Sequence, residues 1–191
     1  VYVVDSRTDD IEIIEALSDE VQIQAISEIR KTFRKLMEQS DRRRMVHRGE
    51  IGKNFRNIMN LIIDDLNTNT DAMIMLMSIS LSDHYSYHHS LKVCINSVLL
   101  GISYGYSREE VMVLGLGALL HDIGKTQVPQ EIIQKSGKLS EEEYKIVQKH
   151  TNYGFELLRN EPNIPLISAH CAYQHHERMN GTGYPRGIQG K

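Results

Sequence analysis

The sequence predicts an all-α protein whose helices form a bundle around a metal centre. Apolar residues recur at helical spacing along most of the chain, and two motifs that start helices stand before apolar runs. Few segments show the alternation of a half-buried strand. With 191 residues, the chain is long enough for one domain with a hydrophobic core, or for a domain and a small appendage.

The first 66 residues are expected to form an N-terminal extension with a short strand and helices. Val1–Val4 is the candidate strand, and residues 41–49 form a basic connector that reads as a solvated loop. Two apolar stripes predict one helix on each side of this connector. Such stripes usually pack onto their own domain, but they also suit a homodimer or the relay of a signal from an upstream sensory domain. The stripes consist of Ile26, Ile29, Phe33 and Leu36, and of Ile51, Phe55, Ile58, Met59, Ile62, Ile63 and Leu66.

Residues 67–191 are expected to form the main domain. The break at residues 67–70 offers Asn69 or Thr70 as the N-cap of a helix over residues 71–81, and the next helix should span about 86–103. Ser107 and Glu110 form a capping box for the helix that ends at residues 121–122.

The later helices are predicted from similar signals. Ser140 and Glu143 form a second capping box, which should open a helix reaching about Arg159. Pro165 suits the first turn of the helix that carries His175 and His176. The glycines and proline of residues 181–185 then force a loop.

Composition narrows the class of function. The net charge of −3 provides no broad basic surface, so binding to a DNA or RNA duplex is not expected. Cys94 and Cys171 lie in apolar helical contexts and are expected to be buried thiols of a reducing compartment. No apolar run approaches the length of a membrane span and no signal peptide is recognised, which favours a cytoplasmic protein.

The adjacent residues His121 and Asp122 are the strongest functional signal. They follow an apolar helix directly, and Lys125 comes three residues later. Burying an imidazole beside a carboxylate is costly unless both groups have a partner, and a metal ion suits both.

Further histidines suggest how the site is completed. His89, His150 and the pair His175 and His176 lie on separate helical segments, each about one helical hairpin from the next. Alone, His150 would more often be a hydrogen-bonded core histidine, and His89 is equally undecided. Together they suggest two divalent cations bridged by Asp122, with a mixed ligand set that favours iron or manganese and admits nickel, cobalt or zinc. Such sites generate hydroxide for attack on phosphorus.

These residues resemble the HD-GYP family of the HD phosphohydrolase superfamily. The resemblance runs from about Ser80 to Lys191. The matching segments are His88-His89-Ser90, Leu120-His121-Asp122-Ile123-Gly124-Lys125, Val128-Pro129, Lys138 to Tyr144, Lys149-His150, His175-His176-Glu177-Arg178 and Gly181-Thr182-Gly183-Tyr184-Pro185. The last segment is typical of this family, whereas a lone His-Asp pair is shared with many nucleotide hydrolases.

The resemblance implies an HD-type helical bundle and a cyclic di-GMP phosphodiesterase that yields pGpG and, in some members, GMP. It implies that Asp122 and Lys125 are catalytic, with Lys125 placed to contact the scissile phosphate. Gly183, Tyr184 and Pro185 match the loop that holds substrate. The implied metal ligands are His89, His121, Asp122, His150, His175 and His176.

Two departures from the family leave alternatives open. Tyr85 stands where some members carry a glutamate linked to a third metal, which points to two metals here. The family's further aspartate ligand would fall past Lys191, so the C-terminal part of the domain is expected to lie outside this chain or to be missing. The alternatives are therefore a catalytically impaired module that binds cyclic di-GMP, or an HD hydrolase of another nucleotide.

Overall fold

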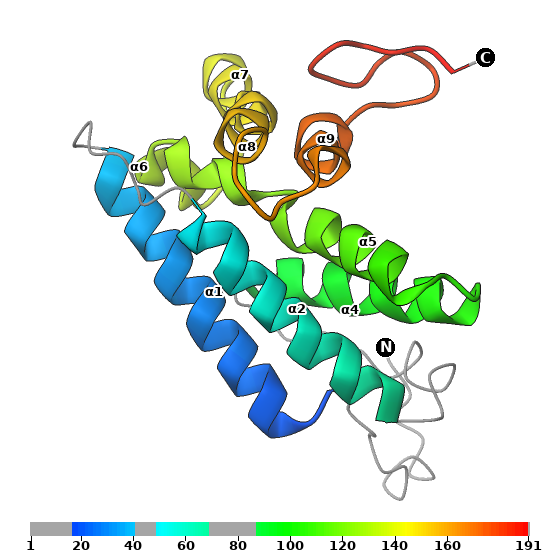
Figure 1. The fold of residues 1–191 in the computed structure, drawn as a ribbon. Helices are drawn as coiled ribbons and strands as arrows, with labels where there is room; N and C mark the ends of the chain where they lie inside the picture. Colours follow the sequence, from blue (N-terminus) through cyan, green and yellow to red (C-terminus); the bar gives the residue numbers. More distant parts are fainter. Residues whose placement is uncertain (1–16, 41–48, 69–86, 191) are drawn as a thin grey trace, which may run out of the picture.

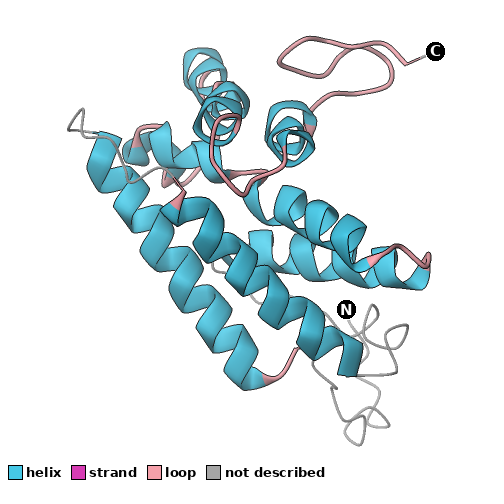
Figure 2. Cartoon of the chain, in the orientation of Figure 1, coloured by secondary structure: helices cyan, strands magenta, loops and turns pink. Residues whose placement is uncertain are grey.

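The prediction of an all-α fold is confirmed. The computed structural model describes residues 17–40, 49–68 and 87–190, and within these ranges the only β-type pairing is an isolated bridge between Asn180 and Gln189 (Figure 2). No helix of these ranges is long and apolar enough to cross a membrane. The helices are α1 (Asp19–Ser40), α2 (Glu50–Thr68), α4 (Tyr87–Ser103), α5 (Arg108–Leu120), the 3₁₀ helix η2 (Ile123–Gln127), α6 (Gln130–Ile133), α7 (Glu141–Gln148), α8 (His150–Leu158) and α9 (Leu166–Gln174).

Some expected elements lie outside the described residues. These are the strand Val1–Val4, the helix over residues 71–81, and the basic connector except for Gly49. The proposed boundary between residues 66 and 67 stays a prediction.

The helices are arranged as two pairs and a third group that meets them at one end. α1 packs along α2, and α4 packs along α5 (Figure 1). α5 also contacts α2 and α9, while α8 contacts α9 and η2. The C-terminal end of α5 therefore lies where all three groups come together.

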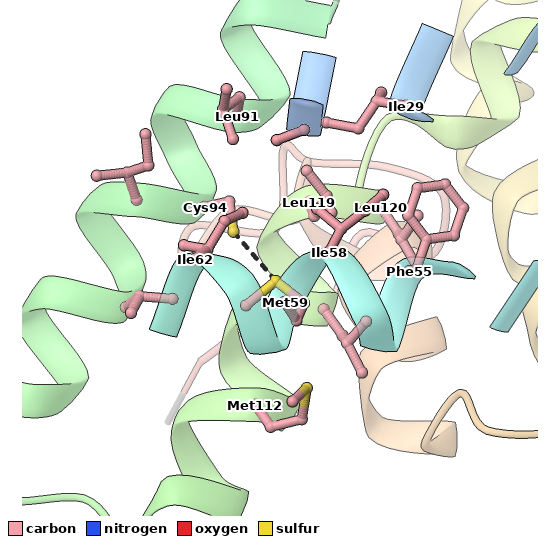
Figure 3. Close-up of a cluster of buried hydrophobic side chains, with 14 of the residues drawn as sticks. Ile29, Phe55, Ile58, Met59, Ile62, Leu91, Cys94, Met112, Leu119 and Leu120 are labelled. Atoms are coloured by element: carbon pink, nitrogen blue, oxygen red, sulfur yellow. Dashed lines mark hydrogen bonds between the residues drawn. The ribbon is translucent and has the colours of Figure 1, made fainter. Parts of the chain in front are cut away.

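One hydrophobic core joins α1, α2, α4 and α5 (Figure 3). Both predicted N-terminal stripes face it, and most of their members are fully buried. Cys94 is buried as expected and donates its Sγ–H to Met59 Sδ at 3.4 Å, whereas Cys171 is only partly buried, contrary to the prediction. Leu119 and Leu120 end the core on the α5 side and precede His121 directly. The core thus fixes the position of the His121-Asp122 pair.

Both predicted capping boxes are present. At the start of α5 the Ser107 side chain accepts from the Glu110 amide, and the Glu110 carboxylate accepts from the Ser107 amide at 2.8 Å. At the start of α7 Ser140 and Glu143 make the same reciprocal contacts. Each box satisfies amides that no preceding turn of helix can pair.

The single helix expected from Ser140 to about Arg159 is wrong in one respect. The chain breaks it at Lys149, whose amide donates to the carbonyls of Ile146 and Val147 instead of continuing the regular pattern. This tight turn separates α7 from α8 and makes His150 the first residue of a new helix. Helical spacing does not reveal the break because apolar residues lie on both sides of it.

The paired histidines lie at the end of α9 rather than inside it. α9 ends at Gln174, His175 is its C-cap, and His176 belongs to the following turn. The expectation that the helix would carry both residues is therefore wrong. Pro165 is the N-cap of α9, one position before its first turn.

A partly buried carboxylate holds the N-terminus of α2 against the turn between α8 and α9. Oε1 of Glu161 accepts from the amides of Gly49 at 2.9 Å and Gly52 at 3.0 Å. A side chain at residue 52 would collide with the Pro162 carbonyl oxygen, so only glycine allows this close approach. The negative charge also suits the positive end of the α2 dipole.

We expect Glu161→Ala to lower the free energy of unfolding by about 1–3 kcal/mol, because it leaves two amides without their charged acceptor. Glu161→Gln should cost less, since its amide oxygen still accepts a hydrogen bond. Urea denaturation followed by circular dichroism measures both.

Glu156 provides a matched control, since its exposed side chain pairs only with Arg159 among the described residues. Glu156→Ala should change stability by less than about 0.5 kcal/mol. Equal losses in the Glu161→Ala and Glu156→Ala variants would contradict the role given to Glu161.

Candidate metal centre

His121 and Asp122 lie where α5 gives way to η2. His121 keeps helical backbone angles as the C-cap of α5, and Asp122 leaves them, with φ −99° and ψ 7°. Leu120 and Ile123 on either side are fully buried. The two polar side chains are therefore held in place by apolar neighbours, and both residues are themselves buried.

Backbone carbonyls orient three of the imidazoles. Nδ1 of His121 lies 2.7 Å from the Ala118 oxygen, and Nδ1 of His150 lies 2.7 Å from the Val147 oxygen. Nδ1 of His175 lies 3.1 Å from the carbonyl oxygens of residues 171 and 172. A carbonyl oxygen only accepts hydrogen bonds, so each neutral ring must carry its proton on Nδ1. The Nε2 lone pair of each ring is then left to face the opposite side, as in metal-bound histidines.

These lone pairs converge on the Asp122 carboxylate. Nε2 of His121 lies 3.3 Å from Oδ2, while Nε2 of His150 and of His175 lie 3.4 and 3.5 Å from Oδ1. The last two nitrogens are also 3.2 Å from each other. Oδ1 is buried and has no hydrogen-bond partner among the described residues. Acceptors that face acceptors in a buried space repel one another, and a cation placed between them removes the repulsion.

The donor atoms fall into two sets that share Asp122. One set contains Asp122, His150, His175 and His176, and the other contains His89, His121 and Asp122. Within each set, the donor atoms all lie within 4.8 Å of one another. The structure therefore brings together all six predicted ligands, in an arrangement that could hold two cations with a shared carboxylate.

Burial favours the neutral form of three of the imidazoles, His89, His150 and His176. It lowers the pKa of His150 to about 4, and burial together with the neighbouring His175 lowers the pKa of His176 to about 4. Burial and the nearby His121 also lower the pKa of His89. Neutral rings have a lone pair available for a metal at pH 7.

Asp122 is ionised at pH 7. Burial raises its pKa, but the hydrogen bonds that His121 and His175 donate whenever their Nε2 is protonated, and the positive charge of Lys125, lower it more, so the pKa lies far below its usual value. The carboxylate is thus ready to bind cations.

Lys125 lies one helical turn after Asp122 and forms an ion pair with it. Nζ is 2.6 Å from Asp122 Oδ2, and the side chain is 23% exposed. A Cβ at Gly124, between them in sequence, would collide with the His150 carbonyl oxygen, so η2 can lie this close to α8 only with glycine there.

The loop of residues 181–185 lies against His176. The Tyr184 ring stacks on the His176 ring at 4.6 Å and 21°, and the Tyr184 amide donates to the His176 carbonyl at 3.2 Å. A side chain at Gly183 would collide with the backbone of residues 176–178, and Pro185 continues the loop half-buried. The predicted loop residues are therefore at the edge of the ligand cluster.

The sequence alone did not assign a role to two residues of this region, Glu177 and Tyr144. The Glu177 carboxylate accepts from the amides of Arg186 at 2.7 Å and Ile188 at 2.9 Å, which closes the loop. Tyr144, on α7, places its ring edge-on to Tyr184 at 6.4 Å. Glu177 directly follows the paired histidines, which was an available signal, whereas only the packing of α7 brings Tyr144 to the loop.

Among the described residues, no other histidine side chain belongs to the cluster. His170 packs on the Phe155 ring at 5.1 Å, away from the ligands. His84 and Tyr85 lie outside the described residues, and the side chain of His88 does too.

Part of the chain matches a known protein family. Residues 100–191 match the model of the HD domain family. A cyclic di-GMP phosphodiesterase of Pseudomonas aeruginosa is 36% identical over 62% of this chain and 28% of its own length. A 3'3'-cGAMP-specific phosphodiesterase of Vibrio cholerae is 32% identical over 85% of this chain and 30% of its own length. The chain thus spans less than a third of the length of these relatives.

A solved structure has the same fold. It is that of an HD-GYP protein of Bdellovibrio bacteriovorus, which is 23% identical and has a TM-score of 0.68. The alignment covers 97% of this chain and 56% of that chain. This likeness supports the helical architecture described above, including α1 and α2.

We expect Asp122→Asn to weaken the binding of both cations by at least about tenfold, because it removes the charge of the ligand that both sets share. His89→Ala should weaken one cation and leave the other in place. Isothermal titration with Mn²⁺, supported by elemental analysis after desalting, distinguishes the two results. Full retention of metal by Asp122→Asn would refute the shared-ligand arrangement.

Metal-free protein should lose stability as the pH falls from about 7 to about 4. The folded-state pKa of His150 and His176 lies below that of an unfolded histidine, so the unfolded chain takes up protons first. Their contribution is complete above the unfolded value of about 6.5 and disappears as the pH falls through the folded value.

Urea denaturation in EDTA at several pH values measures this loss. His150→Gln should flatten the pH dependence, whereas His170→Gln, outside the cluster, should leave it unchanged. An identical pH profile for wild type and His150→Gln would show that His150 does not cause the effect.

Proposed function

Because residues 100–191 match the HD domain family, we propose that this chain belongs to the HD-GYP family and is a metal-dependent phosphodiesterase acting on cyclic di-GMP. The products would be pGpG and, after cleavage of the second bond, GMP. The observation that carries the proposal is the pair of ligand sets that share Asp122. Three relatives are named as cyclic di-GMP phosphodiesterases, which favours hydrolysis of the dinucleotide over binding alone.

We propose two divalent cations as the cofactor, with iron or manganese as the best fit. The donor set contains five imidazoles and one carboxylate, and this mixture of nitrogen and oxygen suits those metals, with nickel, cobalt and zinc as alternatives. When bound, the cations supply the positive charge that lowers the pKa of water and stabilises phosphoryl oxygens.

The chain's own groups account for substrate orientation. The Lys125 ammonium beside Asp122 places positive charge next to the centre, where a phosphate would lie. The stacked rings of Tyr184 and His176, with Tyr144 at their edge, form an aromatic surface for a nucleobase or sugar. Gly183 allows the loop that carries Tyr184 to lie against residues 176–178.

A second substrate is favoured by one comparison. The relative that aligns with 85% of this chain is named as specific for 3'3'-cGAMP, whereas the relative named for cyclic di-GMP aligns with 62%. The two dinucleotides differ in one purine base, so the metal centre alone would not distinguish them. We therefore propose 3'3'-cGAMP as the alternative substrate.

Purified protein loaded with Mn²⁺ or Fe²⁺ should convert cyclic di-GMP or 3'3'-cGAMP into linear products that chromatography resolves. Lys125→Ala should lower kcat by about 100-fold, because it removes a cation beside the developing charge. Lys53→Ala, an exposed lysine on α2, should leave kcat unchanged. Protein with both cations bound that hydrolyses neither dinucleotide would overturn the proposed function.

A further inference from the structure

A cavity of about 760 Å³ opens directly beside the metal centre. Asp122, Lys125 and Thr126 line it on the side of η2. Phe33 and Met37 of α1 line it too, and α1 lies outside the segment that matches the HD domain model. The cavity thus joins the metal centre to the N-terminal helices.

Part of the lining among the described residues is apolar: Phe33, Met37, Ile132, Ile133, Leu139 and Val147. Phe33 is buried and stands edge-on to Phe55 at 6.2 Å, which fixes its ring. Ile133, Leu139 and Val147 line the wall from α6, the following loop and α7. Surfaces of this kind suit a flat, weakly polar group and not a free anion.

Polar and charged side chains form much of the remaining lining, namely Asp122, Lys125, Thr126, Gln130, Gln134 and Lys135. The side-chain amide of Gln134 donates from Nε2 to Gln130 Oε1 at 3.3 Å. Gln130 Nε2 in turn lies 3.6 Å from Met37 Sδ, and this contact joins α6 to α1. Side-chain amides both donate and accept, as the edge of a purine requires. Lys135 lines the cavity too, but Glu143 binds its ammonium at 2.6 Å and offsets its charge.

The size also fits a nucleoside. Small-molecule sites usually occupy about 300–1,000 Å³, and this cavity lies within that range. A nucleotide carries its base one sugar away from its phosphate. A phosphate at Lys125 would therefore leave the base beside the cavity, because Lys125 borders both.

We propose that this cavity is a purine subsite, which binds one base of the substrate and takes part of its wall from α1. The proposal rests on the proposed function, because it assigns the scissile phosphate to the Lys125 side. It makes base recognition depend on α1 and not only on residues 100–191. The 3'3'-cGAMP-specific relative aligns with enough of this chain to include Phe33 and Met37 wherever the alignment begins.

The test uses GMP, AMP and ribose 5-phosphate as probes, with binding measured by isothermal titration calorimetry. GMP or AMP should bind about 10- to 100-fold more tightly than ribose 5-phosphate, because only the nucleotides place a base in the cavity. Two variants place a larger side chain in the cavity from different helices, Ile133→Trp on α6 and Met37→Trp on α1. Either should abolish the advantage of the nucleotides and leave the binding of ribose 5-phosphate unchanged.

Matched controls carry the same substitution elsewhere. Ile167→Trp lies on the exposed side of α9, and Ile23→Trp lies on an exposed face of α1. Both should bind GMP and AMP as wild type does, and circular dichroism confirms that each variant is folded. Equal binding of nucleotides and ribose 5-phosphate by wild type would overturn the subsite, and so would wild-type binding of nucleotides by both filled variants.

Kinetics separate this proposal from the proposed function. Ile133→Trp should raise KM for the cyclic dinucleotide about 10-fold or more and raise KM for bis(p-nitrophenyl) phosphate much less, since that ester has no purine. A protein that binds purine nucleotides in the cavity but cleaves neither substrate would retain the subsite and refute the function. A protein that cleaves both with KM unaffected by either filled variant would retain the function and refute the subsite.

Discussion

The structure depends most on a convergence of lone pairs that cannot satisfy one another. Backbone carbonyls take the Nδ1 protons of His121, His150 and His175, so their Nε2 atoms face the Asp122 carboxylate as acceptors. In a buried space such an arrangement is unfavourable without a cation. The hydrophobic core shared by α1, α2, α4 and α5 stabilises the fold and offsets this unfavourable free energy.

That core also determines where the chemistry takes place. Leu119, Leu120 and Ile123 are buried on both sides of the ligand pair, so the end of α5 cannot move without exposing apolar surface. Glycine at position 124 lets η2 meet α8, which brings His150 to Asp122. The metal centre is therefore part of the packing and not an addition to its surface.

The N-terminal helices belong to the same physical unit as the centre. α1 contributes to the core and to the wall of the cavity beside Lys125, and Glu161 binds the first turn of α2 to the turn before α9. A substrate bound in the cavity would contact both the metal centre and α1. Base selection and any signal that moves α1 would then act through the same contacts.

The sequence by itself determined the features that depend only on residues close together in the chain. The two capping boxes, the apolar stripes of α1 and α2, the His121-Asp122 pair and the glycine-rich loop are local features, and the structure contains all of them. The sequence also supplied the candidate ligands, although it could not distinguish a buried core histidine from a metal ligand at His150.

Only the tertiary structure decided how these pieces meet. It set the proton position on the imidazoles of His121, His150 and His175, the sharing of Asp122 by two ligand sets, the break at Lys149 and the closure of the loop by Glu177. Each of these depends on the distance between groups far apart in the chain, or on a small choice among backbone hydrogen bonds. Periodicity and composition carry no information on such distances, because packing between helices determines them.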